Sequence, residues 1–178
     1  MLKISKILHF IGAFVLTVTL LAGASVKAEA AEKNDYLPDG WRRISESTLS
    51  EEEAEQLQKS VSKEFSENAF RLAAPPLTSV QIIDLALDGK DEIHVVVKEM
   101  GTSKSRSVYW NGRLCPENSK EEQYITQGNI VVGYIHYFHS GVIYSSSVSG
   151  TSVSTSATFI NARSPFNQIG ASKLFVLP

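Results

Sequence analysis

The densest apolar segment outside the N-terminal region runs from Gly128 to Ser140, and its pattern predicts a central strand. Alternate positions from Ile130 onwards are largely apolar on both faces, which is typical of a strand covered on both sides. Gly133, the β-branched residues 130–132 and the aromatic residues that follow all disfavour a helix. We therefore expect the fold to be organised around this strand.

Two hairpins are predicted before the central strand. Each consists of two strand-like runs that flank a turn segment, and at Asn111-Gly112 both turn residues tolerate a positive φ. The runs are Ser79 to Leu87 with Glu92 to Met100 around residues 88–91, and Ser105 to Trp110 with Arg113 to Cys115 around Asn111-Gly112. A polar loop, Glu117 to Gln123, then leads into the central strand.

Further short strands are predicted after a turn at His139 to Gly141. Val142 to Tyr144 opens one strand, and Lys173 to Leu177 forms a closing strand. Residues 145–158 are rich in serine and threonine, and we interpret them as two strands bent or joined at Gly150. The seven or eight short strands together predict a mainly β fold, either a β-sandwich or an open barrel.

One amphipathic helix is predicted before the strands, within residues 48–68. Ser50 and Glu53 have the spacing of a capping box. Apolar residues three and four positions apart form one face of the helix, namely Ala54, Leu57, Val61 and Phe65. The prolines at 75 and 76 end this region in an extended linker. The helix either covers the sheet or belongs to a pro-segment outside it.

The first thirty residues have the features of a secretory signal peptide. Lys3 and Lys6 precede an apolar run from Ile7 to Ala22, and small residues follow it. Cleavage is expected after Ala28 or Ala30, and we favour Ala30. The apolar run is shorter than the roughly twenty residues that a spanning helix needs, so we expect no membrane span after cleavage.

Three regions follow from these patterns: a signal peptide over residues 1–30, a polar N-terminal segment with the helix over 31–76, and a β-rich domain over 77–178.

The chain of 178 residues has a formal net charge of −2, and removal of the signal peptide takes away three lysines and one glutamate. No basic excess remains for nucleic acid. Because Cys115 is the one cysteine, no intramolecular disulfide can form. We expect a secreted, extracellular bacterial protein.

The pattern of residues includes no motif for catalysis or for a cofactor. His136 and His139 are three positions apart on a strand, so we expect them on opposite faces. His94 and His136 could meet if their strands pair, and together with a carboxylate they support an alternative hypothesis, a secreted hydrolase. Without an obvious carboxylate partner these histidines predict no metal site. Cys115 is interpreted as a small buried hydrophobic residue.

Aromatic residues are concentrated in the middle third of the chain. We select four as candidates for ligand binding: Trp110, Tyr109, Tyr124 and Tyr134. Exposed aromatic rings stack on sugars or anchor protein partners, although they also fill cores. Trp110, beside the Asn111-Gly112 turn, is the residue that we least expect to be wholly buried. The leading hypothesis is a non-enzymatic protein that binds an envelope glycan or an extracellular protein. A third hypothesis is a β-hairpin pore-forming toxin-like protein, based on the serine- and threonine-rich segment.

Several short segments between residues 74 and 177 carry a resemblance to a known family. They are Ala74-Pro75-Pro76-Leu77, Trp110-Asn111-Gly112, Gly128 to Phe138, Ile160-Asn161 and Ser164-Pro165-Phe166-Asn167. In these segments the chain resembles the YolA-like family, small secreted proteins of Bacillus-type bacteria whose domain has no established function. The chain departs from that pattern by the insert Ala162-Arg163. The resemblance implies export and β structure and assigns no active residue.

Overall fold

The computed structural model describes residues 36–45, 48–62 and 75–178, so the expected signal peptide lies outside the described residues. Residues Asn34 to Pro178 form one compact unit. Its elements are β1 (Arg42–Arg43), α2 (Glu51–Ser60), β2 (Val61–Ser62), β3 (Ser79–Leu87), β4 (Glu92–Met100), β5 (Ser103–Trp110), β6 (Arg113–Cys115), β7 (Gln123–Gln127), β8 (Ile130–Ile143), β9 (Ser152–Asn161) and β10 (Gln168–Val176).

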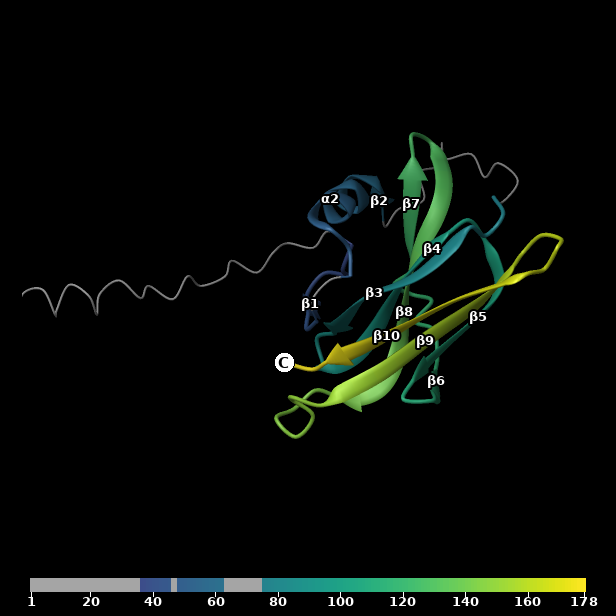
Figure 1. Cartoon of the computed structure of the whole chain (residues 1–178). Coiled ribbons are helices and arrows are strands. Elements are labelled where there is room, and N and C mark those ends of the chain that lie inside the picture. Colours follow the sequence, from purple (N-terminus) through teal and green to yellow (C-terminus); the bar gives the residue numbers. More distant parts are fainter. Residues whose placement is uncertain (1–35, 46–47, 63–74) are drawn as a thin grey trace, which may run out of the picture. The chain divides into compact units, whose positions relative to one another are not determined.

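The strands form two antiparallel sheets (Figure 1). The six-stranded sheet has the order β1-β3-β4-β8-β7-β2, and the four-stranded sheet has the order β10-β9-β5-β6. The predicted mainly β fold, with one helix before the main strands, is confirmed. Among the described residues, no helix has the length and apolar character that crossing a membrane would require.

The predicted central strand is β8, and it is buried on both faces as its pattern indicated. Ile135 and Tyr137 are wholly buried in a cluster on the side of α2. Phe138 is buried on the opposite side, where its ring lies 6.3 Å from that of Phe159 in the four-stranded sheet. The six-stranded sheet is therefore covered on one face by the other sheet and on the other by the N-terminal segment.

The helix covers the sheet and is not separate from it. Ser50 caps it, and Glu53 completes the predicted capping box. Leu57 is buried in the cluster that contains Ile135. The helix ends at Ser60, and Val61 begins a short strand paired with β7, so Val61 does not continue the helical face. The predicted continuation to residue 68, including Phe65, lies outside the described residues.

Both predicted hairpins are confirmed. Asn111 and Gly112 have φ values of 48° and 78°, as a two-residue type I′ turn requires. At the other hairpin, the Asp88 carboxylate accepts hydrogen bonds from the backbone N–H groups of Lys90 and Glu92 at 2.8 and 2.9 Å. Both turns therefore form for local reasons that the sequence already contains.

The predicted turn at His139 to Gly141 is wrong, because β8 continues through it to Ile143. Gly141 has a φ of 71°, and the pairing of β4 with β8 shifts register between Glu92 and His94. The glycine therefore produces a β-bulge and does not reverse the chain. The Gly141 N–H donates to the Glu92 carboxylate at 3.2 Å, which fixes this bulge to β4.

Three further strand predictions need correction. Residues 145–158 do not form two strands: Gly150 belongs to a turn, and its N–H donates to the carbonyl of Leu177 at 2.7 Å. A single strand, β9, follows, and its residues 152–160 pair with β10, so β10 begins at Gln168 and not at Lys173. The predicted loop Glu117 to Gln123 is one residue too long, because Gln123 begins β7, an unpredicted strand that the Gly128-Asn129 turn connects to β8.

Gly133 is required by the close approach of β4 and β8. A Cβ atom at this position would lie 2.3 Å from the carbonyl oxygen of Glu99, which is backbone that cannot move aside. Gly133, which disfavours a helix, therefore also lets the backbones of β4 and β8 approach each other closely.

Replacing Ile135 with alanine is expected to lower the free energy of unfolding by about 2–5 kcal/mol, since its side chain is wholly buried. The matched control is Ile143→Ala on the same strand, where the side chain is 57% exposed and little change is expected. Denaturant unfolding of both variants checks this. Equal midpoints for Ile135→Ala and the parent protein would contradict the assignment of β8.

Candidate functional site

The four-stranded sheet has one buried and one solvent-facing surface, and β9 shows this most clearly. Its odd-numbered residues Val153, Thr155, Ala157 and Phe159 are buried, and its even-numbered residues are exposed or half-buried. We call the solvent-facing surface of this sheet the outer face. By register and exposure it consists of Ser105, Ser107, Tyr109, Leu114, Ser152, Ser154, Ser156, Thr158, Ile160, Gln168, Gly170, Ser172, Leu174 and Val176.

One row of the outer face crosses all four strands. Leu114 pairs with Tyr109, Tyr109 with Ser156, and Ser156 with Ser172. Neighbouring strands lie about 4.8 Å apart, so these side chains form a continuous line on one surface. Tyr109 is half-buried, and its ring is flanked by an exposed leucine on one side and by serine hydroxyls on the other.

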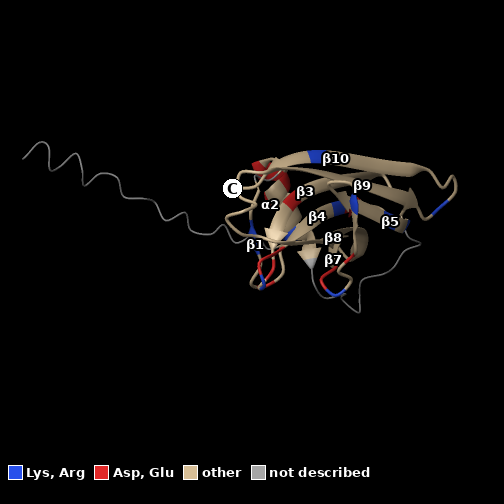
Figure 2. Ribbon diagram, turned by 90° about the horizontal axis from the view of Figure 1, so that it is seen from below, with Lys and Arg blue, Asp and Glu red and all other residues tan. Residues whose placement is uncertain are grey.

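None of these outer-face residues is charged, and the exposed Lys104 lies beside them in the bulge of β5 next to Ser105. Charged residues are sparse on β9 and β10 (Figure 2): β9 has none, and β10 has Lys173. Lys173 pairs with buried Thr155 and so belongs to the other face. For the part of the chain that the structure describes, no side-chain hydrogen bond involves the hydroxyls of Ser107, Ser156 or Thr158. These hydroxyls are available to a ligand.

The four predicted aromatic residues occupy different surroundings. Trp110 is only 6% exposed and lies in the core between the sheets, so the expectation that it escapes burial is wrong. Its strand position, one residue from Tyr109, points it inward. Tyr124 and Tyr134 pair across β7 and β8 with ring centroids 5.8 Å apart, and Tyr134 stacks on His136. Of the four, Tyr109 alone belongs to the outer face.

A cluster of charged side chains lies between the two sheets around His136. Glu99 and His136 are wholly buried, and the Glu99 Oε2 atom lies 2.7 Å from His136 Nε2 and 3.1 Å from Arg106 Nε. The His136 Nδ1 atom lies 2.9 Å from Glu117 and 3.3 Å from Glu122. Three strands and a loop therefore contribute to one network.

The charges in this network stabilise one another. Burial alone would lower the pKa of His136, but the carboxylates of Glu117 and Glu99 hold it above its ordinary value. Burial would raise the pKa of Glu99, but contacts with His136 and Arg106 bring it below its ordinary value. Both shifts favour the charged forms of the buried pair, which connects β4, β5 and β8.

Two groups of side chains in the described residues have the types and spacing of metal ligands. The first, Glu117, Glu122 and His136, already surrounds the guanidinium of Arg106, which lies 3.1 Å from Glu117. A cation there would face this fixed positive charge. The second, Glu92, His94 and His139, lies on the opposite face of the six-stranded sheet.

The predicted meeting of His94 with His136 is wrong. His94 pairs with His139 across β4 and β8, and their rings lie 4.5 Å apart. His136 pairs with Val97 and faces the core between the sheets. The expectation that His136 and His139 lie on opposite faces agrees with this arrangement. Their register decides the partners, and the sequence alone does not show which residues of two strands stand opposite.

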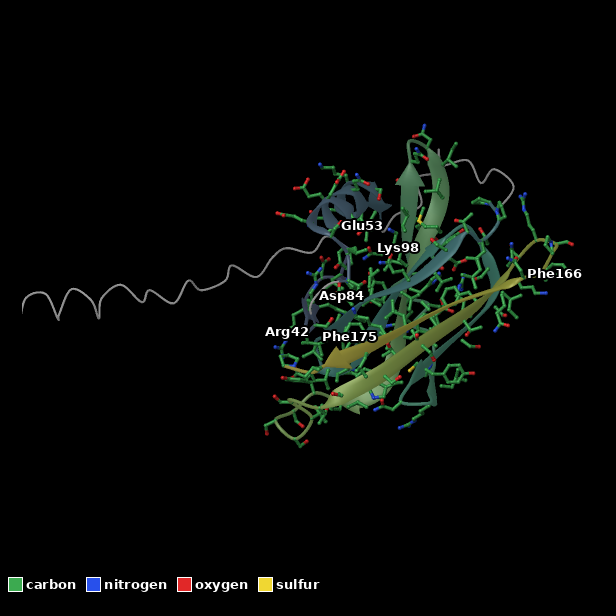
Figure 3. All side chains as sticks on the ribbon, viewed as in Figure 1. Arg42, Glu53, Asp84, Lys98, Phe166 and Phe175 are labelled. Atoms are coloured by element: carbon green, nitrogen blue, oxygen red, sulfur yellow. The ribbon has the colours of Figure 1, made fainter. Side chains whose placement is uncertain are left out.

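A third buried group lies beneath the N-terminal segment. The Asp84 carboxylate on β3 (Figure 3) is wholly buried, accepts a hydrogen bond from the Tyr36 hydroxyl and lies 3.1 Å from Arg43 Nε. Burial raises the pKa of Asp84 to about 6, although Tyr36, Arg43 and Ser45 oppose the shift. This carboxylate attaches residues 36–45 to the sheet.

Comparison with known proteins gives one match. A family model described as a domain of unknown function, DUF4879, matches residues 86–175. These residues include β4 to β9, the outer-face residue Tyr109 and the group Glu92, His94 and His139. Neither the curated proteins nor the solved structures contain a match to the chain.

The raised pKa of Asp84 predicts a specific pH dependence. With a pKa of about 6 in the folded state and its ordinary lower value in the unfolded state, the folded protein takes up this proton first as the pH falls. The free energy of unfolding of the parent protein, minus that of Asp84→Asn, is expected to rise by about 1 kcal/mol between pH 7 and pH 5. Denaturant unfolding at both pH values measures this difference. A constant or falling difference would contradict the buried, ionisable carboxylate.

Proposed function

The chain belongs to the DUF4879 family, a domain of unknown function, and we propose that it is a secreted, non-enzymatic protein that binds a neutral envelope glycan through the outer face. The observation that carries this proposal is the composition of that face: uncharged, rich in hydroxyl groups and containing Tyr109. Our closer placement within the YolA-like family remains part of the proposal, as does export through a signal peptide.

The hydroxyl groups and the aromatic ring of the outer face are the groups that sugars bind. Serine and threonine hydroxyls both donate and accept hydrogen bonds, as sugar hydroxyls do. An aromatic ring such as Tyr109 offers an apolar face on which the C–H side of a sugar ring can pack. The absence of charged residues from the outer face favours a neutral polymer over an anionic one, which would call for Lys or Arg.

The shape of the sheet supports an extended ligand. The row Leu114, Tyr109, Ser156 and Ser172 spans four strands, and the next row contains Ser107, Thr158 and Gly170. Gly170 has no side chain, so the surface beside Thr158 stays low. Exposed Leu174 and Val176, on the edge strand β10, add apolar contact area.

We favour binding over the other two hypotheses for structural reasons. The hydrolase hypothesis needs His94 and His136 at one site, and these lie on opposite faces of the sheet. The pore-forming hypothesis needs a hairpin that can leave the domain, whereas β9 is paired on both sides, with β5 and with β10. The inner face of β9 is also buried in the core.

Replacing Tyr109 with alanine is expected to weaken retention on insoluble neutral glycans, chitin or cellulose, by about tenfold, the size of one lost aromatic contact. Ser156→Arg, in the same row, is also expected to weaken retention, because the arginine side chain is bulky and charged. The control is Phe166→Ala. Phe166 is a 57% exposed aromatic in the loop joining β9 to β10 (Figure 3), and its replacement should leave retention unchanged.

Retention is measured as the bound fraction against polymer concentration, with denaturant unfolding to establish that each variant is folded. Folded Tyr109→Ala and Ser156→Arg variants that bind like the parent protein would exclude the outer face. If the parent protein binds no neutral glycan and captures an extracellular protein, the proposed ligand is wrong and a protein partner takes its place.

Export is tested separately. When the chain is expressed in a Gram-positive host, mass spectrometry of the culture medium is expected to find a mature N-terminus at Ala31 or Glu29, because small residues precede both positions. Recovery of the chain only in the membrane fraction, with residues 1–30 intact, would contradict secretion.

A further inference from the structure

A second group of side chains, Glu92, His94 and His139, lies away from the outer face and has no role in the proposed glycan binding. His94 on β4 and His139 on β8 stand directly opposite each other, with ring centroids 4.5 Å apart. The Glu92 Oε2 atom lies 3.2 Å from His139 Nδ1. One ligand atom from each of these three residues lies within 4.8 Å of the other two.

The backbone holds this group in place. Glu92 and His94 are two residues apart on one strand and so lie on the same face. The β8 bulge at Gly141 aims its N–H at the other oxygen of Glu92, at a distance of 3.2 Å. The carboxylate is thus fixed by the backbone that follows His139, and the three side chains converge.

His94 gives the independent observation that points to a ligand. It is wholly buried, and within the described residues neither of its ring nitrogens has a hydrogen-bond partner. A buried polar group without a partner is costly and therefore uncommon. The Asp88 carboxylate lies 3.4 Å from Nε2 as an ion-pair contact, whereas Nδ1 has no hydrogen-bond partner among the described residues.

We propose that Glu92, His94 and His139 bind a divalent transition-metal ion of the zinc type. Two imidazoles and one carboxylate form a common ligand set for Zn²⁺. A tetrahedral ion with bonds of about 2.0–2.1 Å sets its ligand atoms about 3.3–3.4 Å apart. The Glu92 Oε2 and His139 Nδ1 atoms, 3.2 Å apart, already fit this spacing. Any further approach to His94 falls on His139 and Glu92, whose side chains are 34% and 22% exposed.

Neighbouring residues suit the site. Asp88 lies beside Nε2 of His94, where a carboxylate orients a ligating imidazole through its second nitrogen. The ring of Trp41 lies 4.2 Å from that of His94 and covers it. The ion would therefore join β4 and β8 close to the point where the N-terminal segment packs on the sheet.

Zinc titration calorimetry of the purified, metal-free protein tests the proposal. One ion per chain is expected, with binding at least tenfold weaker in His139→Ala and in Glu92→Gln, both of which alter partly exposed side chains. Glu117→Gln and Glu122→Gln, in the other candidate group, serve as matched controls and should bind zinc like the parent protein.

Trp41 supplies a second readout. Paramagnetic Co²⁺ is expected to quench its fluorescence in a Trp110→Phe variant, in which Trp41 is the remaining tryptophan. The quenching should be lost in Trp110→Phe/His139→Ala. No zinc binding, or binding that Glu117→Gln weakens and His139→Ala does not, would overturn the assignment. Because none of these variants alters the outer face, glycan retention should be unaffected whichever result is found.

Discussion

The pairing of β4 with β8, buried on both faces, is the constraint on which the rest of the structure depends. Val95 and Val97 face the four-stranded sheet, and Val96 faces the N-terminal segment. Two separate layers must therefore cover the same strand pair. The four-stranded sheet uses its inner face for this, which leaves its outer face as the large surface without a packing role. The location of the proposed binding surface follows from the burial of the central strands.

Each covering layer also carries buried charge. Glu99, His136 and Arg106 join the two sheets, and Asp84 with Arg43 joins the N-terminal segment to the six-stranded sheet. Pairs of this kind contribute little net stability, but losing one partner is costly because the other charge stays buried. They favour one arrangement of layers over others. The imidazole of His94 differs from these groups because, within the described residues, neither of its ring nitrogens forms a hydrogen bond, and this supports the proposed metal ion.

Local patterns made much of the fold predictable. The Asn111-Gly112 turn, the capping box at Ser50 and the apolar residues of β8 each depend on neighbours in sequence, and each is confirmed. The predicted turn at His139 to Gly141 was wrong because a glycine with positive φ fits a turn or a β-bulge equally well. Pairing of β8 with β4 decides between the two. The expectation for Trp110 is wrong because side chains alternate along β5, which turns Tyr109 outward and Trp110 into the core.

The site was less predictable than the fold. Alternation along β9 could have revealed the outer face, since small hydroxyl residues occupy each even-numbered position from Ser152 to Thr158. The partners of His94 and Glu99 could not be found in this way. They depend on register between strands far apart in sequence, and no local pattern specifies which residues stand opposite.

The most direct test of the glycan-binding surface is an NMR titration of the ¹⁵N-labelled protein with soluble oligosaccharides of glucose and of N-acetylglucosamine. The account predicts that the largest shifts of amide resonances occur at Ser107 to Tyr109 and at Ser154 to Thr158, with His94 and His139 unaffected. Shifts confined to the side of α2, or no shifts with either sugar, would contradict it.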